Sequence, residues 1–312
     1  MKFFGPDAVS DATPWAELIR AIEDIFVTDG AVAPDRTVHT VAVPGGADAS
    51  LLLKPGWVVG DVIAVKVVTF FPENGPKGLA TVNGGVLLFS ASDGTFIGAC
   101  DGNVLTARRT AAASAVAAKR LARPDAKRLL VVGTGALGPM TAQAHSAVRA
   151  FDHITVWGRT VSKAHDVAEE LRTLGLRASA SEDLDASVAE ADVISCVTGS
   201  TSPLLKGALL KDGAHVDLIG AFSPQMRESD DETIRRARVW VDTKSDAILA
   251  GDLAQPLESG ILSVDDIEGD LAELISGACP TRENDTEITL FKSAGTALED
   301  VAAAKLVFDA DV

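Results

Sequence analysis

The sequence predicts an α/β protein, with a doubly wound parallel sheet and a second, smaller α+β domain. Beyond residue 123, short apolar runs alternate with helix-length segments, which is typical of a parallel sheet covered by helices on both faces. Before that residue, strand-like runs are separated by Pro, Gly and Asp turns, which indicates an antiparallel sheet. The 312 residues are enough for two domains with separate cores.

The first domain is expected to begin with a helix over residues 14–26. Its apolar side chains recur at helical spacing, with Thr13 placed to cap the helix and Pro14 in the first turn. The antiparallel strands are expected at Val38–Val43, Ser50–Leu53, Val62–Phe70, Ala80–Ser90 and Thr95–Ala99. The edges of such a sheet must be covered, or paired across a dimer. An alanine-rich helix, Thr106–Ala122, follows and ends at Arg123-Pro124.

The parallel strands are expected at Arg128–Val132, His153–Trp157, Val193–Val197, His215–Ile219 and Val239–Val241. A last strand at Thr289–Phe291 and a helix at Gly295–Phe308 are expected to fold back onto the first domain. The predicted domains are therefore residues 1–122, completed by 290–312, and residues 123–289.

A glycine loop is the strongest motif of the parallel-sheet domain. The stretch Gly133-Thr-Gly-Ala-Leu-Gly138 follows a predicted strand and precedes a predicted helix. In that setting the pattern G-x-G-x-x-G lets the backbone approach a pyrophosphate and turns helix N–H groups toward the anion. We therefore expect a Rossmann-type dinucleotide site that includes Gly133, Gly135 and Gly138.

The end of the second parallel strand indicates which dinucleotide is bound. It reads Trp157-Gly-Arg-Thr160, with Lys163 soon after, and it lacks the acid that binds the ribose hydroxyls in most NAD enzymes. Arg159 can bind a phosphate through paired hydrogen bonds, or it can be a solvated surface residue. We expect contacts from Gly158, Arg159, Thr160 and Lys163, a preference for NADP, and NAD as a usable alternative. Thr198 follows a later strand and is either a ribose or nicotinamide contact or a plain loop hydroxyl.

Basic residues of the first domain predict a site for a carboxylate. Arg108 and Arg109 fall in the first turn of the expected alanine-rich helix, where cations are unfavourable unless an anion joins them. Arg109 is the preferred ligand and Arg108 is expected to face solvent, although both can be exposed. Lys66 interrupts the apolar strand Ala64-Val-Lys-Val-Val68 and is either an outward-facing side chain or a buried functional group.

Composition excludes several classes of partner. The formal net charge of -16 disfavours nucleic acids and anionic membranes. The three cysteines lie far apart, which suits a reducing compartment, and the N-terminus lacks a signal-peptide pattern. The histidines show no metal-ligand spacing. We expect a cytoplasmic protein without a metal or a membrane span, acting on a small molecule.

These motifs resemble the ornithine cyclodeaminase and mu-crystallin family. The resemblance runs over nearly the whole chain, and its most specific piece is Asp101-Gly-Asn-Val-Leu-Thr-Ala-Arg-Arg-Thr-Ala-Ala112. The glycine loop, Val216-Asp-Leu-Ile-Gly-Ala221 and Leu290-Phe-Lys-Ser-Ala-Gly-Thr-Ala-Leu-Glu-Asp300 extend it. It implies a homodimer whose first domains pair their sheets, with the C-terminal helix completing that domain.

The resemblance also implies roles for single residues. The family's carboxylate-binding arginines fall on Arg36 and Arg109, and its active-site lysine falls on Lys66. Ala294 would touch the substrate. The cofactor contacts would fall on Thr81, Ala136, Leu137, the end of the second strand, Thr198, the stretch 216–219 that ends at Ile219, and Ser293.

Two departures from the cyclodeaminases narrow the expected chemistry. Phe222 stands where those enzymes carry an acid–base aspartate. The glutamate that holds the amine of ornithine falls near Leu52 in Leu51-Leu-Leu-Lys54, which is another apolar replacement. Phenylalanine cannot move a proton, although Phe222 can line the substrate pocket.

The departures favour an NAD(P)H-dependent reductase of cyclic ketimines such as Δ1-pyrroline-2-carboxylate or Δ1-piperideine-2-carboxylate. Arg36 and Arg109 would hold the carboxylate, and Lys66 would orient it and assist proton transfer. Three alternatives stay open at this point: ornithine cyclodeaminase, which forms proline and ammonia; an amino-acid dehydrogenase; and a non-enzymatic, NADPH-dependent ligand-binding protein like mu-crystallin.

Overall fold

A computed structural model describes residues 2–310 of the chain. The chain divides into two compact units, one running to Arg109 and resuming at Thr296, the other spanning Thr110–Gly295. The predicted fold class is confirmed, since the second unit carries a parallel sheet and the first combines a largely antiparallel sheet with helices. No helix among residues 2–310 is long and apolar enough to cross a membrane.

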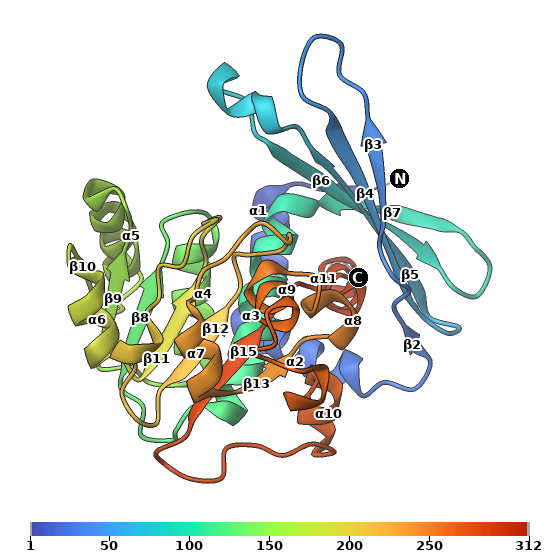
Figure 1. The fold of residues 1–312 in the computed structure, drawn as a ribbon. Coiled ribbons are helices and arrows are strands. Elements are labelled where there is room, and N and C mark those ends of the chain that lie inside the picture. The colour runs from blue at the N-terminus through green and yellow to red at the C-terminus, as the bar shows by residue number, and fades with distance from the viewer. Residues whose placement is uncertain (1, 311–312) are drawn as a thin grey trace. The chain divides into compact units, whose positions relative to one another are not determined.

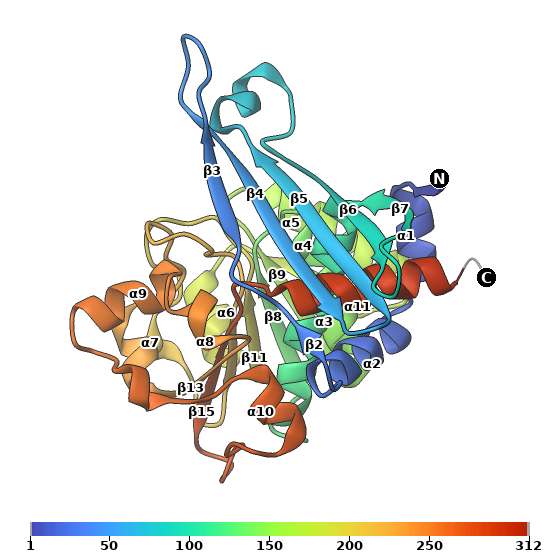
Figure 2. The same ribbon diagram turned by 90° about the vertical axis from the view of Figure 1, so that its right-hand side faces the viewer.

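The first unit is built on a 7-stranded sheet in the order β1-β7-β6-β5-β4-β2, with β3 also paired to β4. Helix α11 packs against β4, β5 and β6 and against α2, and Figure 2 shows it crossing these strands. The elements are β1 (Lys2–Phe4), α1 (Pro6–Ala12), α2 (Trp15–Phe26), β2 (Ala31–Val32), β3 (Thr37–Val41), β4 (Ala49–Val58), β5 (Val62–Phe70), the 3-10 helix η1 (Pro72–Lys77), β6 (Val82–Ser90), β7 (Phe96–Asp101), the start of α3 (Gly102–Leu121), and α11 (Ala297–Asp309).

Strand β4 runs farther than its sequence indicates. The expected strand ended at Leu53, before Lys54-Pro55-Gly56, but the pairing with β5 continues to Val58. Strand β3 covers the other edge of β4 only as far as Leu53, and β2 covers it from Trp57. Pro55 lies between these two partners, so its missing N–H removes no ladder bond on that edge.

Helix α3 begins earlier than predicted, which corrects the view of the two arginines. It starts at Gly102, so Arg108 and Arg109 lie beyond the first turn and the argument from the helix dipole fails. Arg108 is also buried rather than solvent-facing. Its Nε donates to Thr13 Oγ1 at 2.7 Å and its guanidinium stacks 4.2 Å from the centre of the Trp15 ring. Thr13 therefore ends α1 and holds Arg108, and it does not cap α2.

The second unit is an 8-stranded parallel sheet in the order β10-β9-β8-β11-β12-β15-β13-β14 (Figure 1). Its elements are β8 (Arg128–Val132), α4 (Leu137–Val148), β9 (His153–Trp157), α5 (Val161–Thr173), β10 (Ala178–Ser181), α6 (Leu184–Glu190), β11 (Val193–Cys196), η2 (Gly207–Leu209), β12 (His215–Leu218), α7 (Asp231–Arg236), β13 (Ala237–Val241), α8 (Lys244–Ala247), α9 (Gly251–Glu258), η3 (Val264–Asp266), β14 (Ile267–Gly269), α10 (Leu271–Ser276) and β15 (Ile288–Lys292).

Both faces of this parallel sheet are buried, as continuous apolar strands predict. Leu129 and Val131 of β8 join one core, with side chains from α4 and α5. Leu130 and Val132 of the same strand join a second core, with side chains from α6, α7 and α9. The alternation along β8 therefore places one hydrophobic core on each side of the sheet.

The last strand does not return to the first unit, contrary to the prediction. β15 lies between β12 and β13 in the parallel sheet, and all five of its residues are buried. Its backbone hydrogen bonds are satisfied there, so the chain crosses to the first unit only after Gly295. Of the expected tail, residues 290–312, only the part from Thr296 onward then belongs to the first unit.

A fully buried polar chain crosses the second unit. Asp217 of β12 lies 3.0 Å from His145 Nε2 of α4 and 3.0 Å from His215 Nε2. His215 Nδ1 lies 2.8 Å from Thr289 Oγ1 of β15. Burial lowers the pKa of His215, although the charge of Asp217 opposes that shift. The neutral imidazole is therefore favoured in the folded protein.

Acid should destabilise the protein through His215. Its folded pKa lies below the usual 6.5, so the unfolded chain binds more protons and the free energy of unfolding falls as pH decreases below about 6.5. Urea denaturation of wild type and His215→Gln between about pH 7 and about pH 5 measures how much His215 contributes to the pH dependence of the free energy of unfolding. The variant lacks the titrating group, so it should lose that contribution. The exposed His165→Gln is the matched control and should keep the wild-type pH dependence. Equal pH dependence in His215→Gln and wild type would contradict the prediction.

Candidate active site

The glycine loop has the backbone geometry that its sequence predicts. Gly133 has φ +133°, and a Cβ there would lie 2.9 Å from the carbonyl oxygen of Val197. A Cβ on Gly138 would lie 2.7 Å from the carbonyl oxygen of Gly133. Gly135, in contrast, has no heavy atom within 4 Å of its ideal Cβ position. The outer glycines thus close the turn, and the middle one leaves open space beside the N-terminus of α4, the place of a pyrophosphate in such loops.

A cavity of about 240 Å³ lies beside this loop at the carboxyl ends of β8, β9 and β11. It brings together seven of the predicted cofactor residues: Gly133, Gly135, Gly158, Arg159, Thr160, Lys163 and Thr198. Arg159, Thr160 and Lys163 are exposed and supply two cations and a hydroxyl. Among residues 2–310, the lining of this cavity includes no aspartate or glutamate.

The other predicted cofactor contacts do not line this cavity. Ala136, Leu137 and Gly138 form the start of α4, Ile219 is buried after β12, and Ser293 follows β15. Thr81 belongs to the first unit, where its carbonyl accepts the backbone N–H of Phe71 at 2.8 Å. The structure therefore groups the residues near Arg159 and leaves the roles of these six as predictions.

Buried acids hold the loops at the carboxyl edge of the parallel sheet. Glu228 Oε1 accepts the backbone N–H of Thr198 at 2.6 Å and its hydroxyl at 2.9 Å. Glu228 Oε2 accepts the backbone N–H of Gly220 at 2.7 Å. Burial and the charge of Asp252 raise the pKa of Glu228 to about 7. This side chain ties the loops after β11 and β12 together.

A second acid holds the loop after β15. Asp242 Oδ2 accepts the Ser293 hydroxyl at 3.1 Å and the backbone N–H of Ala294 at 2.7 Å. It also accepts the backbone N–H of Gly295. Ser293 and Ala294, which the family resemblance places at the cofactor and the substrate, are therefore fixed by a buried carboxylate.

The first unit contains a buried cluster of charges around Lys66. Lys66 Nζ donates to Asp300 Oδ1 at 2.8 Å, and Arg109 Nε lies 3.0 Å from the same oxygen. Arg109 Nη1 also donates to Glu299. Lys66 and Arg109 are each only 4% exposed. Of the two readings of Lys66, the outward-facing one is thus wrong, because α11 brings acids onto its face of the sheet.

The cluster changes the ionisation of its members. Burial lowers the pKa of Lys66 to about 7, helped by the charges of Arg109 and Lys54 and opposed by Asp300. Burial acts to raise the pKa of Asp300, but the charges of Lys66 and Arg109 outweigh it and hold that pKa below its usual value. Lys66 can therefore exchange a proton near neutral pH, while Asp300 stays ionised.

The remaining predicted substrate residues are distributed over both units. Arg36 is half-buried directly before β3, and Leu52 is half-buried within β4. Phe222 is 46% exposed in the loop after β12.

Sequence reasoning missed several charged residues of these sites, among them Lys54, Glu228, Asp242, Glu299 and Asp300. Glu299 and Asp300 carry a visible signal, since two adjacent acids interrupt the apolar helix Ala297–Asp309. The dipeptide Pro55-Gly56 after Lys54 resembles a turn, so the predicted strand ended before Lys54. Glu228 lies in a loop that has no hydrophobic periodicity. Its hydrogen bonds to the loops after β11 and β12 are visible only in the folded structure.

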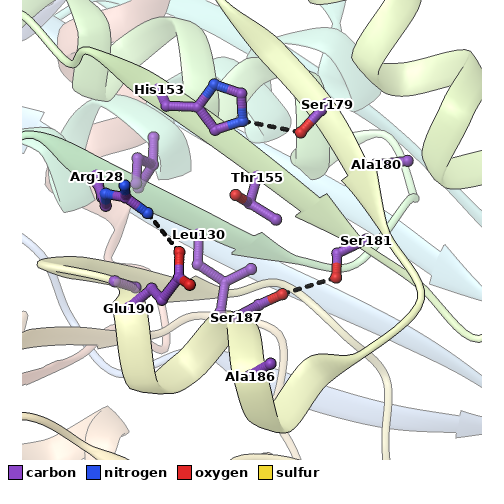
Figure 3. A pocket seen from close by; sticks show the side chains of 12 residues that line it. Arg128, Leu130, His153, Thr155, Ser179, Ala180, Ser181, Ala186, Ser187 and Glu190 are labelled. Carbon is purple, nitrogen blue, oxygen red and sulfur yellow. Dashed lines mark hydrogen bonds and ion pairs between the residues drawn. The ribbon is translucent and has the colours of Figure 1, made fainter.

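A larger hollow of about 490 Å³ lies between α6 and strands β8, β9 and β10. Figure 3 shows that its polar side chains point toward one another. His153 Nε2 lies 2.8 Å from Ser179 Oγ, and Arg128 pairs with Glu190. Because the charged side chains of its described lining are mutually paired, this hollow is a poorer candidate for the reaction than the Lys66 cluster.

Comparisons with known proteins agree with these features. The chain matches the ornithine cyclodeaminase/mu-crystallin family over residues 7–311. It is 33% identical to the Delta(1)-pyrroline-2-carboxylate reductase of Paracoccus denitrificans, covering 94% of this chain and 92% of that one. It is 37% identical to the ketimine reductase mu-crystallin of Mus musculus, covering 90% and 85%.

A solved structure is similar over nearly its whole length. The Delta(1)-pyrroline-2-carboxylate reductase of Thermococcus litoralis, in complex with NADH and L-proline, superposes with a TM-score of 0.93. The sequences are 31% identical, and the match covers 99% of this chain and 97% of the other. With the match over residues 7–311, these relationships show that the chain belongs to the ornithine cyclodeaminase/mu-crystallin family.

Proposed function

We propose that this protein is an NAD(P)H-dependent reductase of cyclic ketimines such as Δ1-pyrroline-2-carboxylate and Δ1-piperideine-2-carboxylate. The observation that carries the proposal is the buried charge cluster of the first unit. Lys66 Nζ and Arg109 Nε both lie within 3.0 Å of Asp300 Oδ1, and Lys54 is paired with Lys66 across the two strands. Buried basic side chains favour a ligand that carries a carboxylate.

The residues that differ from the cyclodeaminases support reduction over deamination. Phe222 cannot act as the acid–base aspartate, and Leu52 cannot bind the side-chain amine of ornithine. Relatives named Delta(1)-pyrroline-2-carboxylate reductase and ketimine reductase support the same choice. The neighbour solved with NADH and L-proline holds the kind of product that this reaction would form.

The basic residues expected to contact the substrate each have a role in this reaction. Arg36 and Arg109 bind the substrate carboxylate, and Arg109 is itself held by Glu299 and Asp300. Lys66 orients the carboxylate, and its ammonium gives a proton to the imine nitrogen, so an N–H bond forms as one on Lys66 breaks. The nicotinamide cofactor, when bound, supplies the hydride that adds to the imine carbon. The C=N double bond thereby becomes the C–N single bond of the cyclic amino acid.

Loss of NADPH absorbance on adding each of a panel of cyclic ketimines tests the proposal. We expect turnover with a cyclic ketimine that carries a 2-carboxylate, and none with the analogue that lacks it. Formation of proline from ornithine without added reductant would instead indicate a cyclodeaminase. Tight NADPH-dependent ligand binding without turnover would indicate a binding protein, and oxidation of alanine an amino-acid dehydrogenase.

We also propose that NADP(H) is preferred over NAD(H), with contacts from Arg159, Thr160 and Lys163. Arg159→Ala should raise KM for NADPH by about 10- to 100-fold, because it removes hydrogen bonds to a doubly charged phosphate. KM for NADH should change little, since NADH lacks that phosphate. Arg177→Ala is the matched control, because Arg177 is exposed and lies outside the cavity lining. An equal rise in KM for both cofactors would contradict the preference.

We further propose a homodimer in which the sheets of two first units pack face to face. The strand β5 alternates, with Lys66 buried toward α11 and Ile63, Val65 and Val67 half-buried on the opposite face. Leu51 and Leu53 of β4 extend this apolar face. A second copy of the sheet would cover it.

Light scattering should give twice the chain mass of 32.3 kDa for wild type and a monomer for Val65→Arg. The arginine places an unpaired charge within the proposed apolar interface. Val38→Arg is the control, because Val38 lies on the other face of the sheet and is already 58% exposed. A monomeric wild type would overturn the proposal, as would a dimeric Val65→Arg.

A cytoplasmic location is also proposed. Cys100, Cys196 and Cys279 are all free thiols, and two of them are buried. Free thiols are typical of proteins from a reducing compartment.

A further inference from the structure

Two lysines lie directly opposite each other inside the first unit. The register of β4 and β5 pairs Lys54 with Lys66, and the two side chains point to the same face of the sheet. Their exposed fractions are 8% and 4%. Lysines are seldom buried, and like charges directly opposite in a sheet are destabilising. Because burying this pair of lysines lowers stability, we expect that the pair serves a function.

The charged and titratable groups around Lys66 come from each element packed against it. Strand β4 supplies Lys54, α3 supplies Arg109, and α11 supplies Asp300 and Glu299. Strand β6 places the apolar Val86 opposite Lys66. On β7, burial raises the pKa of the Cys100 thiol to about 12, so this group stays neutral.

Arg109 is already engaged by both carboxylates, since its Nε lies 3.0 Å from Asp300 Oδ1 and its Nη1 donates to Glu299. Asp300 is therefore shared between Arg109 and Lys66, which weakens its hold on the Lys66 proton. Lys54 adds a further positive charge on the same face of the sheet and acts on Asp300 as well. Lys54 therefore places a like charge beside Lys66, in addition to the charge of Arg109.

We propose that Lys54 is a positioning residue that acts on Lys66 through its like charge and makes the Lys66 ammonium a readier proton donor. The proposal rests on the proposed function only in giving Lys66 a reaction to serve. When a substrate carboxylate enters the cluster, its negative charge offsets Lys54 and favours the protonated Lys66. Substrate binding would thereby charge the proton donor at the moment when the imine nitrogen needs a proton.

The ionisation of Lys66 can be followed without turnover. The Cε resonance of Lys66, in protein labelled with ¹³C-lysine and assigned by Lys66→Arg, reports its titration. In Lys54→Met, which replaces a buried cation by an apolar chain of similar length, the midpoint should rise by about one pH unit. Lys54→Arg keeps the charge and should keep the wild-type midpoint. Lys77→Met is the matched control, because Lys77 is exposed in η1 and should leave the midpoint unchanged.

Kinetics give the second measurement. The alkaline limb of the pH profile of kcat/KM should move upward in Lys54→Met and stay in place in Lys54→Arg. An unchanged Lys66 midpoint in Lys54→Met would overturn the proposal. A raised KM with an unmoved midpoint would also overturn it and would make Lys54 a direct ligand of the carboxylate. If the midpoint rises but no ketimine is reduced, the inference about Lys54 stands and the proposed function fails.

Discussion

Replacing Lys66 with methionine should lower kcat for Δ1-pyrroline-2-carboxylate by about 10²- to 10⁴-fold, the usual contribution of a general acid. The fold should persist, because Asp300 keeps its ion pair with Arg109 at 3.0 Å when the ammonium is lost. The proton then comes from solvent, which is slower in a buried site. Steady-state rates across pH, with circular dichroism to check folding, measure the effect.

A conservative variant and a surface variant complete this test. Lys66→Arg keeps the charge but holds its proton throughout the accessible pH range, so its rate should stay low and lose the alkaline limb. Lys77→Met, the exposed control of η1, should match wild type. A Lys66→Met rate equal to wild type would mean that the imine takes its proton from water before binding, and would remove Lys66 from the reaction.

Replacing Arg109 with methionine should lower the free energy of unfolding by about 3–5 kcal/mol and abolish carboxylate binding. Arg109 is the ion-pair partner of both Glu299 and Asp300, all three being buried. Its removal leaves the Glu299 carboxylate buried without this partner, which is the costly outcome for an ion pair in a protein interior. Urea denaturation and the KM for the ketimine measure the two effects separately.

A double variant separates stability from function. Glu299→Gln removes the charge that Arg109 neutralises, so Arg109→Met with Glu299→Gln should regain a large part of the lost stability. Activity should not return, because the substrate carboxylate still lacks its ligand. If activity returned together with stability, Arg109 would be a structural residue and the assignment of the carboxylate site would be wrong.

Local patterns were sufficient for much of the fold and for the grouping of residues around the glycine loop. The strands β8 and β9 were predicted at their observed bounds, because an apolar run between helices depends little on distant contacts. The glycine loop and Arg159 were also predicted, and the cavity brings them together, because a turn and the strand end beside it form one local unit.

Predictions that needed a distant partner failed. Pro55 lies in the middle of a strand because β2 and β3 leave that edge uncovered, and the Pro-Gly dipeptide alone suggests a turn. Arg108 is buried because Thr13 and Trp15 from other helices surround it. Strand β15 pairs with β12 on one side and β13 on the other. Its own residues do not indicate which strands it will pair with.

The sequence by itself determined that this chain has a glycine loop of the dinucleotide-binding type, basic residues at the end of the strand beside it, and basic residues at positions 66 and 109. These properties depend on residue type and short-range spacing, which the chain carries before it folds. Only the tertiary structure decided that Lys54 lies opposite Lys66 and that Glu299 and Asp300 hold Arg109. Strand register and helix packing bring together residues far apart in the sequence, and burial then sets the charge and proton affinity of each.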